Sequence, residues 1–255
     1  LRTKHFPVSN HRERSLFYEL FPRRGIFDIL TITFLHQLKM VYLNNAHKDC
    51  VINIVSINIL VVIDGQNDFM DISGSALPVT GAAEDMSRIA GLIDQLGHQL
   101  WDIQLTLDTH HEYHIAHPVF WTDSQGQSPA PFTLISLSDV TSGKWRARVP
   151  NHQAMATEYV ETLAKSGRYE LVVWQPHCLV GSWGHNLYQP LYNAVSSWEK
   201  QHLAIASKVT KGSNWSTEHY SAVKADVVRS DDPGTQLNVD FIQSLQNADR
   251  VFLSG

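Results

Sequence analysis

A short segment of the chain, DTHHEYHIAHP, concentrates side chains that bind metal ions or transfer protons. It contains Asp108, His110 and His114, and in an extended backbone residues i and i+2 point to the same side. Asp108 and His110 can therefore hold one ion together. The chain has fourteen histidines, and their clustering here favours a metal site over a chance grouping of surface residues. His111 and His117 are interpreted as neighbours of that site rather than as ligands.

A second segment, WQPHC, places His177 and Cys178 directly after an apolar run. Three interpretations are open: a metal ligand, a nucleophile beside its base, or a packed turn. His177 is the best placed third ligand for the ion of Asp108 and His110. Two imidazoles and one carboxylate leave coordination positions for water or a substrate atom, which is typical of a reactive metal site. Zinc, iron and manganese all suit this set of ligands.

The sequence around these segments alternates apolar runs with amphipathic stretches. Residues 54–64 form a β-branched apolar run, as expected of a strand buried on both faces of a parallel sheet. Met86, Ile89, Ile93 and Leu96 recur at helical spacing. Strands are predicted at 54–64, 101–108, 168–174, 203–211 and 250–255, and helices at 81–100, 151–167, 187–202 and 234–249. This order predicts an α/β domain, a mostly parallel sheet with helices on both faces in a Rossmann-type three-layer arrangement.

Polar residues follow four of the predicted strands: Asp64, Asp108, His177 and Lys211. In open parallel sheets, ligands bind beyond the carboxyl ends of the strands. Taken singly, an aspartate at such a position is as often a turn former or a helix cap. A lysine before a glycine is usually a solvated turn residue. Their occurrence at four strand ends nevertheless predicts one shared cleft.

The composition limits the classes of partner. The net charge of −5 and the isoelectric point near 6.3 argue against nucleic acid and an anionic membrane as partners, so a small-molecule substrate is expected. Two cysteines and the lack of an export signal make the cytoplasm the default location. Residues 1–53 are interpreted as an N-terminal extension of uncertain status, and residues 54–255 as one domain. The long connection at about 118–150 is interpreted as an insertion.

Four segments resemble, in the same order, the motifs of nicotinamidases within the isochorismatase-like cysteine hydrolases: VVIDGQNDF, DTHHEYH, WQPHC and KGSNWSTEHYSA. The resemblance covers residues 54–255 and implies the isochorismatase-like fold. It implies a catalytic triad and a divalent metal ion, with zinc as the first choice and iron or manganese as alternatives. The implied roles are Asp64 as general base, Lys211 as cationic triad member, Asp108, His110 and His177 as metal ligands, and His114 as an additional ligand or neighbour of the ion.

The resemblance also implies an activity, the hydrolysis of a nicotinamide-like amide to a carboxylate and ammonia through a thioester, in NAD metabolism. A small-molecule amide is therefore the expected partner, and a homo-oligomer is left open. Phe69, Trp121 and Tyr220 are candidates for the substrate pocket. For Trp121, packing of the insertion against the core is the favoured alternative.

The nucleophile is the part of the site that the sequence leaves open. The family's nucleophilic cysteine follows the strand that corresponds to residues 250–255, and the sequence ends at Gly255. The favoured interpretation is a metal-containing cysteine amidohydrolase truncated before its nucleophile, so the chain as given is expected to be inactive. One alternative is an inactive relative that binds a metal and a small molecule. Another is that Cys178 itself is the nucleophile.

Overall fold

The computed structural model describes residues 56–167 and 169–255, so the boundary predicted between residues 53 and 54 lies outside the described residues. The strands are β1 (Asn58–Ile63), β2 (Asp102–Asp108), β3 (Trp121–Thr122), β4 (Leu134–Ile135), β5 (Arg146–Ala147), β6 (Leu171–Val172), β7 (Ser207–Lys211) and β8 (Arg250–Ser254). The α-helices are α3 (Ala82–Leu96), α4 (Leu137–Thr141), α5 (Gln153–Ser166), α6 (Gln189–His202) and α7 (Val239–Gln246). Short 3-10 helices cover Asn67–Phe69, Gly97–Gln99, Pro118–Phe120, Pro150–His152 and Pro233–Thr235. Within the described part of the chain, no helix combines the length and the hydropathy needed to cross a membrane.

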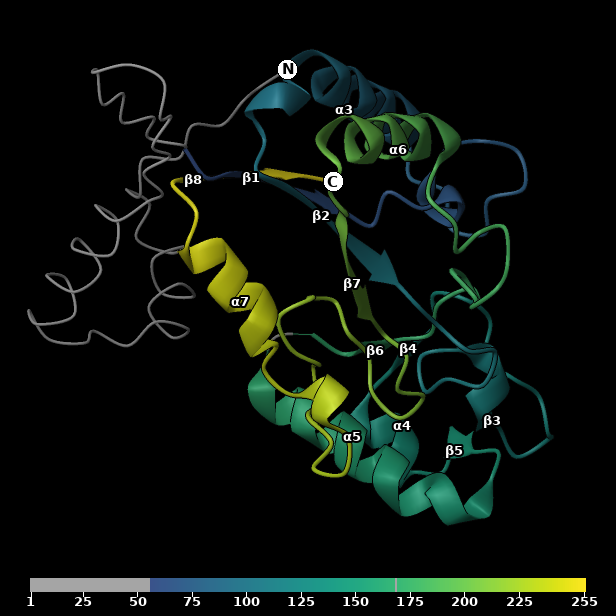
Figure 1. Cartoon of the computed structure of the whole chain (residues 1–255). Coiled ribbons are helices and arrows are strands. Elements are labelled where there is room, and N and C mark those ends of the chain that lie inside the picture. Colours follow the sequence, from purple (N-terminus) through teal and green to yellow (C-terminus); the bar gives the residue numbers. More distant parts are fainter. Residues whose placement is uncertain (1–55, 168) are drawn as a thin grey trace, which may run out of the picture. The chain divides into compact units, whose positions relative to one another are not determined.

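The main sheet is parallel and has four strands in the order β7-β2-β1-β8, seen across the centre of Figure 1. Its central strands β1 and β2 carry the predicted apolar runs, and Ile59 to Val62 are at most 3% exposed. In the register of the ladder Asp108 lies opposite Lys211, and Ile63 lies opposite Thr106. The carboxyl ends of β1, β2 and β7 therefore meet at one edge. The predicted α/β architecture with a parallel sheet is confirmed.

Helices cover the two faces of this sheet (Figure 1). On one face α3 and α6 pack together over Leu60, Val62 and Leu105. On the other face α7 approaches β2, where the Gln104 amide donates a 2.9 Å hydrogen bond to Ser244. On α3 the predicted apolar positions Met86, Ile89 and Ile93 are buried, which confirms the helical spacing there. Leu96, predicted on the same face, is 44% exposed because its backbone has left helical geometry (φ −116°, ψ 1°).

The strand predicted at 168–174 is not part of the main sheet, which corrects the sequence-based expectation. Its core, β6, pairs antiparallel with β4. Its partner thus comes from the 118–150 connection, whose short elements pack on α5 in a second apolar cluster. After β6 the segment reaches the carboxyl end of β2, where His177 contacts Asp108 and Leu179 forms an isolated parallel bridge with His110, two residues beyond the strand.

Candidate active site

Asp64 follows the last residue of β1 and is held by the neighbouring strand. Its N–H donates to the carbonyl and hydroxyl oxygens of Thr106 (3.2 and 3.1 Å), and the hydroxyl donates to Asp64 Oδ1 at 2.7 Å. Its φ of +50° is uncommon for a residue with a side chain, and such strain is frequent at functional sites. The side chain is 21% exposed, so the carboxylate can meet a bound molecule.

Lys211 ends β7 and places its ammonium group between two carboxylates. Its Nζ lies 3.0 Å from Asp64 Oδ2 and 3.2 Å from Asp108 Oδ1, and the side chain is only 6% exposed. Burial alone would lower the pKa of Lys211, but the charges of Asp108 and Asp64 outweigh it and raise that pKa above its ordinary value. The lysine is therefore charged at neutral pH.

Asp108, the last residue of β2, is fixed through its backbone by Gln66. The Gln66 side chain accepts the Asp108 N–H at 2.7 Å and donates to the Asp108 carbonyl at 2.8 Å. Burial opposes ionisation of Asp108, yet Lys211 and then His110 hold the pKa of its carboxyl well below the usual range. The carboxylate is therefore available as a metal ligand.

His110 and His177 present their Nε2 atoms to the same oxygen, Asp108 Oδ2, each at 3.2 Å. Their Nδ1 atoms lie 3.2 Å from the carbonyl of Gly212 and 2.8 Å from that of Gln175. An imidazole that donates from Nδ1 has Nε2 free for a metal, and this backbone bond also orients the ring. One ligand atom from each of Asp108, His110 and His177 lies within 4.8 Å of the others. The structure thus brings the three predicted ligands together.

The protonation of His110 depends on the carboxylates that face it. Its Nε2 lies 3.9 Å from Glu218 Oε1 as well as 3.2 Å from Asp108 Oδ2. Burial would lower the pKa of His110, but Glu218 and Asp108 raise it to about 9. Without an ion, a proton on Nε2 balances the two carboxylates, and a metal ion would replace that proton.

Buried polar atoms without a hydrogen-bond partner gather around this cluster. Among the described residues there are six such side-chain atoms, and five belong to Asp108, His110, His117, Glu218 and His219. An unsatisfied buried polar atom costs about 1–3 kcal/mol. Asp108 Oδ1 already faces the Lys211 ammonium, and His219 Nε2 carries a proton because Nδ1 accepts the Gly212 N–H. A divalent cation would satisfy the imidazole nitrogens of His110 and His117, so the residues fit a metal ion.

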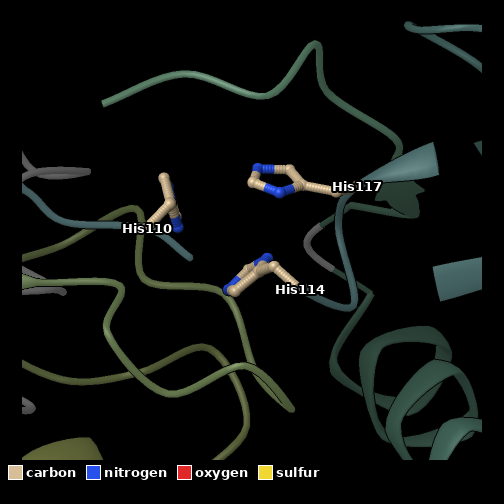
Figure 2. Close-up of side chains that lie close together, drawn as sticks. All are labelled: His110, His114 and His117. Carbon is tan, nitrogen blue, oxygen red and sulfur yellow. The ribbon is translucent and has the colours of Figure 1, made fainter. Parts of the chain in front are cut away.

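His114 and His117 lie beside His110, as the close-up in Figure 2 shows. Their ring centroids are 4.6 and 5.3 Å from that of His110, and all three side chains are fully buried. His114 accepts the Ala116 N–H at Nδ1 and donates from Nε2 to Thr217 O, both at 3.1 Å. Burial lowers the pKa of His114 and, with help from the neighbouring histidines, that of His117 to about 3. Both rings are therefore neutral.

The candidate pocket residues lie in different places. The Phe69 ring meets the His177 ring edge to face at 5.4 Å, so it borders the metal cluster. Trp121 is fully buried in the second apolar cluster, where its Nε1 donates to Ile115 O at 2.6 Å. Tyr220 is 45% exposed, and its hydroxyl accepts a hydrogen bond from Trp174.

Cys178 is buried, and its backbone N–H and carbonyl both form hydrogen bonds within the site. Its N–H donates to Asp68 Oδ2 at 2.7 Å, and its carbonyl accepts the His110 N–H at 3.0 Å. Burial raises the pKa of its thiol far above the ordinary value, and nearby carboxylates, first that of Asp108, add to this effect. A thiol of this type is a poor nucleophile. These two hydrogen bonds instead hold the segment of His177 between Asp68 and His110.

Three further residues build the site, although residue type and spacing did not indicate them. Gln66 fixes Asp108, and Glu218 faces His110. Gly212 has a φ of +84°, and a Cβ there would lie 2.8 Å from His110 Cε1 and 3.0 Å from Asp108 Oδ1. All three lie inside the motif segments VVIDGQNDF and KGSNWSTEHYSA, which is the signal that could have found them.

Comparison with solved structures identifies proteins that have a similar fold. The yeast nicotinamidase Pnc1p superimposes with a TM-score of 0.51 at 19% sequence identity, covering 77% of this chain and 74% of that chain. The chain has the nicotinamidase fold. A second structure of Pnc1p, bound to the inhibitor nicotinaldehyde, matches with a TM-score of 0.51 at 20% identity and the same coverage. No protein-family model and no curated protein sequence matches the chain. The nicotinamidase-like, isochorismatase-like fold implied by the motifs is thus confirmed.

Proposed function

We propose that this chain carries the proton-accepting and metal-binding parts of a cysteine amidohydrolase that acts on nicotinamide-like amides. The observation that carries the proposal is the position of Lys211 Nζ, 3.0 Å from Asp64 and 3.2 Å from Asp108. This contact joins a partly exposed carboxylate at the end of β1 to a carboxylate that faces two histidines. A base and a site for a cation thereby lie side by side, and both would serve a metal-containing amidohydrolase.

In the proposed reaction the Asp64 carboxylate accepts the proton of a cysteine thiol. The thiolate adds to the amide carbonyl, the carbon–nitrogen bond breaks, and ammonia leaves with the transferred proton. Water then adds to the thioester, with Asp64 again accepting a proton, and releases the carboxylic acid and the thiol. Lys211 would balance the negative charge of the Asp64 carboxylate and, after the proton transfer, that of the thiolate. The resemblance places the nucleophilic cysteine after β8.

Asp108, His110 and His177 would hold the metal ion, for which zinc is the first choice and iron or manganese an alternative. When bound, the ion would supply an orienting contact to the ring nitrogen of a pyridine substrate. Phe69, next to His177, offers an apolar face for the ring. The binding of nicotinaldehyde by the yeast enzyme supports a pyridine carbonyl compound as the substrate class.

The proposal is tested with the protein purified from the cells that make it, by measuring ammonia release from nicotinamide and from benzamide. We expect turnover of nicotinamide and little turnover of benzamide, which lacks the ring nitrogen. Asp64→Asn should abolish turnover and retain the metal, whereas Asp108→Ala should lose the metal. Full metal content in Asp108→Ala would contradict the assigned ligands, and unchanged turnover in Asp64→Asn would contradict the assigned base.

A second function, metal-dependent binding of a small molecule without catalysis, is favoured by the state of Cys178. It is the one free cysteine among the described residues, and it is fully buried. C-terminal peptide sequencing of the natural protein by mass spectrometry separates the two functions. A cysteine soon after β8 supports the hydrolase, and a natural chain without one supports the binding protein.

A further inference from the structure

We propose that His117, and not His114, supplies a fourth protein ligand to the ion held by Asp108, His110 and His177. This inference rests on the proposed metal site and adds to it a residue that neither the motifs nor the spacing indicated. It follows from the hydrogen bonds of each imidazole ring.

The ring of His117 is prepared for a metal in the same way as the rings of His110 and His177. Its Nδ1 lies 3.2 Å from the carbonyl of Glu112, so Nδ1 carries the proton and Nε2 carries the free lone pair. His110 and His177 likewise turn Nδ1 to a backbone carbonyl. In each case the backbone fixes the tautomer that leaves Nε2 to bind an ion.

The Nε2 atom of His117 has no partner within the described residues, although the side chain is fully buried. Leaving such an atom unsatisfied is unfavourable, and cores rarely retain one without a reason. Two other imidazole nitrogens of the described residues are buried and unpartnered, His110 Nε2 and His219 Nε2. His219 accepts the Gly212 N–H at Nδ1, so its Nε2 carries a proton, whereas His110 Nε2 faces Asp108. A cation between the Nε2 atoms of His110 and His117 would satisfy both atoms at once.

The position of His117 is compatible with a shared ion. Ligand atoms of His110, His114 and His117 lie within 4.8 Å of one another, and His110 also belongs to the group formed with Asp108 and His177. The ring centroids of His110 and His117 are 5.3 Å apart. The centroid of His117 is 6.0 Å from that of His177. Figure 2 shows the His117 ring extending toward His110. Ligands of a four-coordinate zinc at ~2.0–2.1 Å lie about 3.4 Å apart, so the rings of His117 and His177 must move toward each other for both to bind the same ion.

His114 is as close to His110 as His117 is, yet both of its nitrogens are occupied. Nδ1 accepts the Ala116 N–H, and Nε2 donates to the carbonyl of Thr217, both at 3.1 Å. To bind an ion it would have to break one of these buried bonds. His114 therefore ties the segment after β2 to the segment after β7 and positions the ligands without being one.

Four protein ligands would complete a tetrahedral zinc site, and a substrate atom would then enter as a fifth ligand or replace His117. The inference therefore predicts that the metal ion has four protein ligands when no substrate is bound. Cobalt(II) reports the number of ligands, because tetrahedral Co(II) absorbs visible light much more strongly than Co(II) with five or six ligands.

The test compares Co(II) binding by the full chain and by His117→Ala, His117→Cys and His114→Gln. We expect a strong visible spectrum from the unsubstituted protein. His117→Ala should weaken the affinity by at least about 100-fold, above the 10–100-fold that is typical of residues that only orient a ligand, and should reduce the absorption. His117→Cys should restore affinity and add a thiolate-to-cobalt charge-transfer band in the near ultraviolet. His114→Gln should leave the shape of the spectrum unchanged.

The His117→Cys band is decisive, because a thiolate gives it only in direct contact with the ion, and it is read in protein that circular dichroism shows to be folded. If His117→Ala binds Co(II) as the unsubstituted protein does and His117→Cys shows no band, His117 is a packing residue and the inference is wrong. If the spectrum changes in His114→Gln instead, His114 is the ligand. If the unsubstituted chain itself binds no Co(II) or Zn(II), the proposed metal site fails as a whole.

Discussion

The ammonium group of Lys211 lies 3.2 Å from Asp108 Oδ1, while the other oxygen of that carboxylate faces His110 and His177 at 3.2 Å. Asp108 is thus shared between the cation of the protein and the position expected for a metal ion. The same ammonium group contacts Asp64 at 3.0 Å. The charge of Lys211 therefore couples the two halves of the site.

Lys211→Met should destabilise the fold, because it leaves two carboxylates facing each other with no cation between them. Breaking a buried ion pair from one side costs about 3–5 kcal/mol. Lys208→Met is the matched control on the same strand, since its side chain is 48% exposed and lies 3.7 Å from Glu199. That exposed pair should contribute less than about 1 kcal/mol. Urea unfolding of both variants measures the difference, and equal losses would contradict the coupling described above.

Gly212→Ala should weaken both the fold and the binding of metal. The new Cβ would lie 2.8 Å from His110 Cε1, at a φ of +84°. Gly126→Ala is a matched control, because Gly126 has the same φ of +84° with nothing within 4 Å of its Cβ position. The control measures the backbone strain alone, about 1–3 kcal/mol. Gly212→Ala should cost a further ~1–3 kcal/mol and lower the Zn(II) affinity, as measured by unfolding and chelator competition. Equal behaviour of the two variants would show that His110 tolerates the contact.

Cys178 should be unreactive in the folded protein. Its thiol is fully buried, and its pKa is raised by burial and by the carboxylates of Asp108 and Asp68. In a Cys50→Ser background, we expect labelling by a thiol reagent at pH 8 to be at least about 100-fold slower in the folded than in the unfolded state. Cys178→Ala should retain full metal content. Fast labelling of the folded protein would support the alternative that Cys178 is the nucleophile.

Metal binding should release a proton at pH 7. The pKa of His110 is raised to about 9 by Glu218 and Asp108 against the effect of burial. The proton on His110 therefore stabilises the metal-free fold fully below the ordinary pKa of 6.5, and this contribution is lost as the pH rises through about 9. Because an ion must displace this proton, Zn(II) affinity should fall about tenfold for each pH unit below 9. Titration calorimetry in buffers of different ionisation enthalpy should detect about one released proton per ion.

Glu218→Gln provides the control for that measurement. It removes one of the two carboxylates that raise the pKa of His110, at 3.9 Å from His110 Nε2, and keeps the shape of the side chain. Proton release at pH 7 should then decrease, because less of His110 starts out protonated. The protonation state assigned to His110 would be wrong if the unsubstituted protein releases no proton on metal binding. It would also be wrong if Glu218→Gln releases as many protons as the unsubstituted protein.

The sequence by itself determined the elements that carry Asp64, Asp108 and Lys211. The apolar runs of β1 and β2 predicted buried strands of a parallel sheet. In β7 only Lys211 is buried, and the four residues before it are exposed or half-buried. Because parallel strands end at a common edge, Asp64, Asp108 and Lys211 were predicted to lie close together. The helices α3, α5 and α6 were predictable from apolar residues at helical spacing or from the residues that begin and end a helix. Gly167 ends α5 in the left-handed conformation (φ 64°), and Pro190 lies in the first turn of α6.

Only the tertiary structure decided how His177 reaches the site and which of the other histidines face an ion. The run at 168–174 reads as a strand of the main sheet, but its hydrogen bonds go to β4, because an apolar run does not specify its partner strand. His177 is held instead by two backbone hydrogen bonds of its segment, from the His110 N–H to the Cys178 carbonyl and from the Val180 N–H to the His110 carbonyl. His114 and His117 are alike in type and burial. Their roles differ because the Ala116 N–H and the Thr217 carbonyl, which is distant in the sequence, occupy both nitrogens of His114, whereas one nitrogen of His117 is left free.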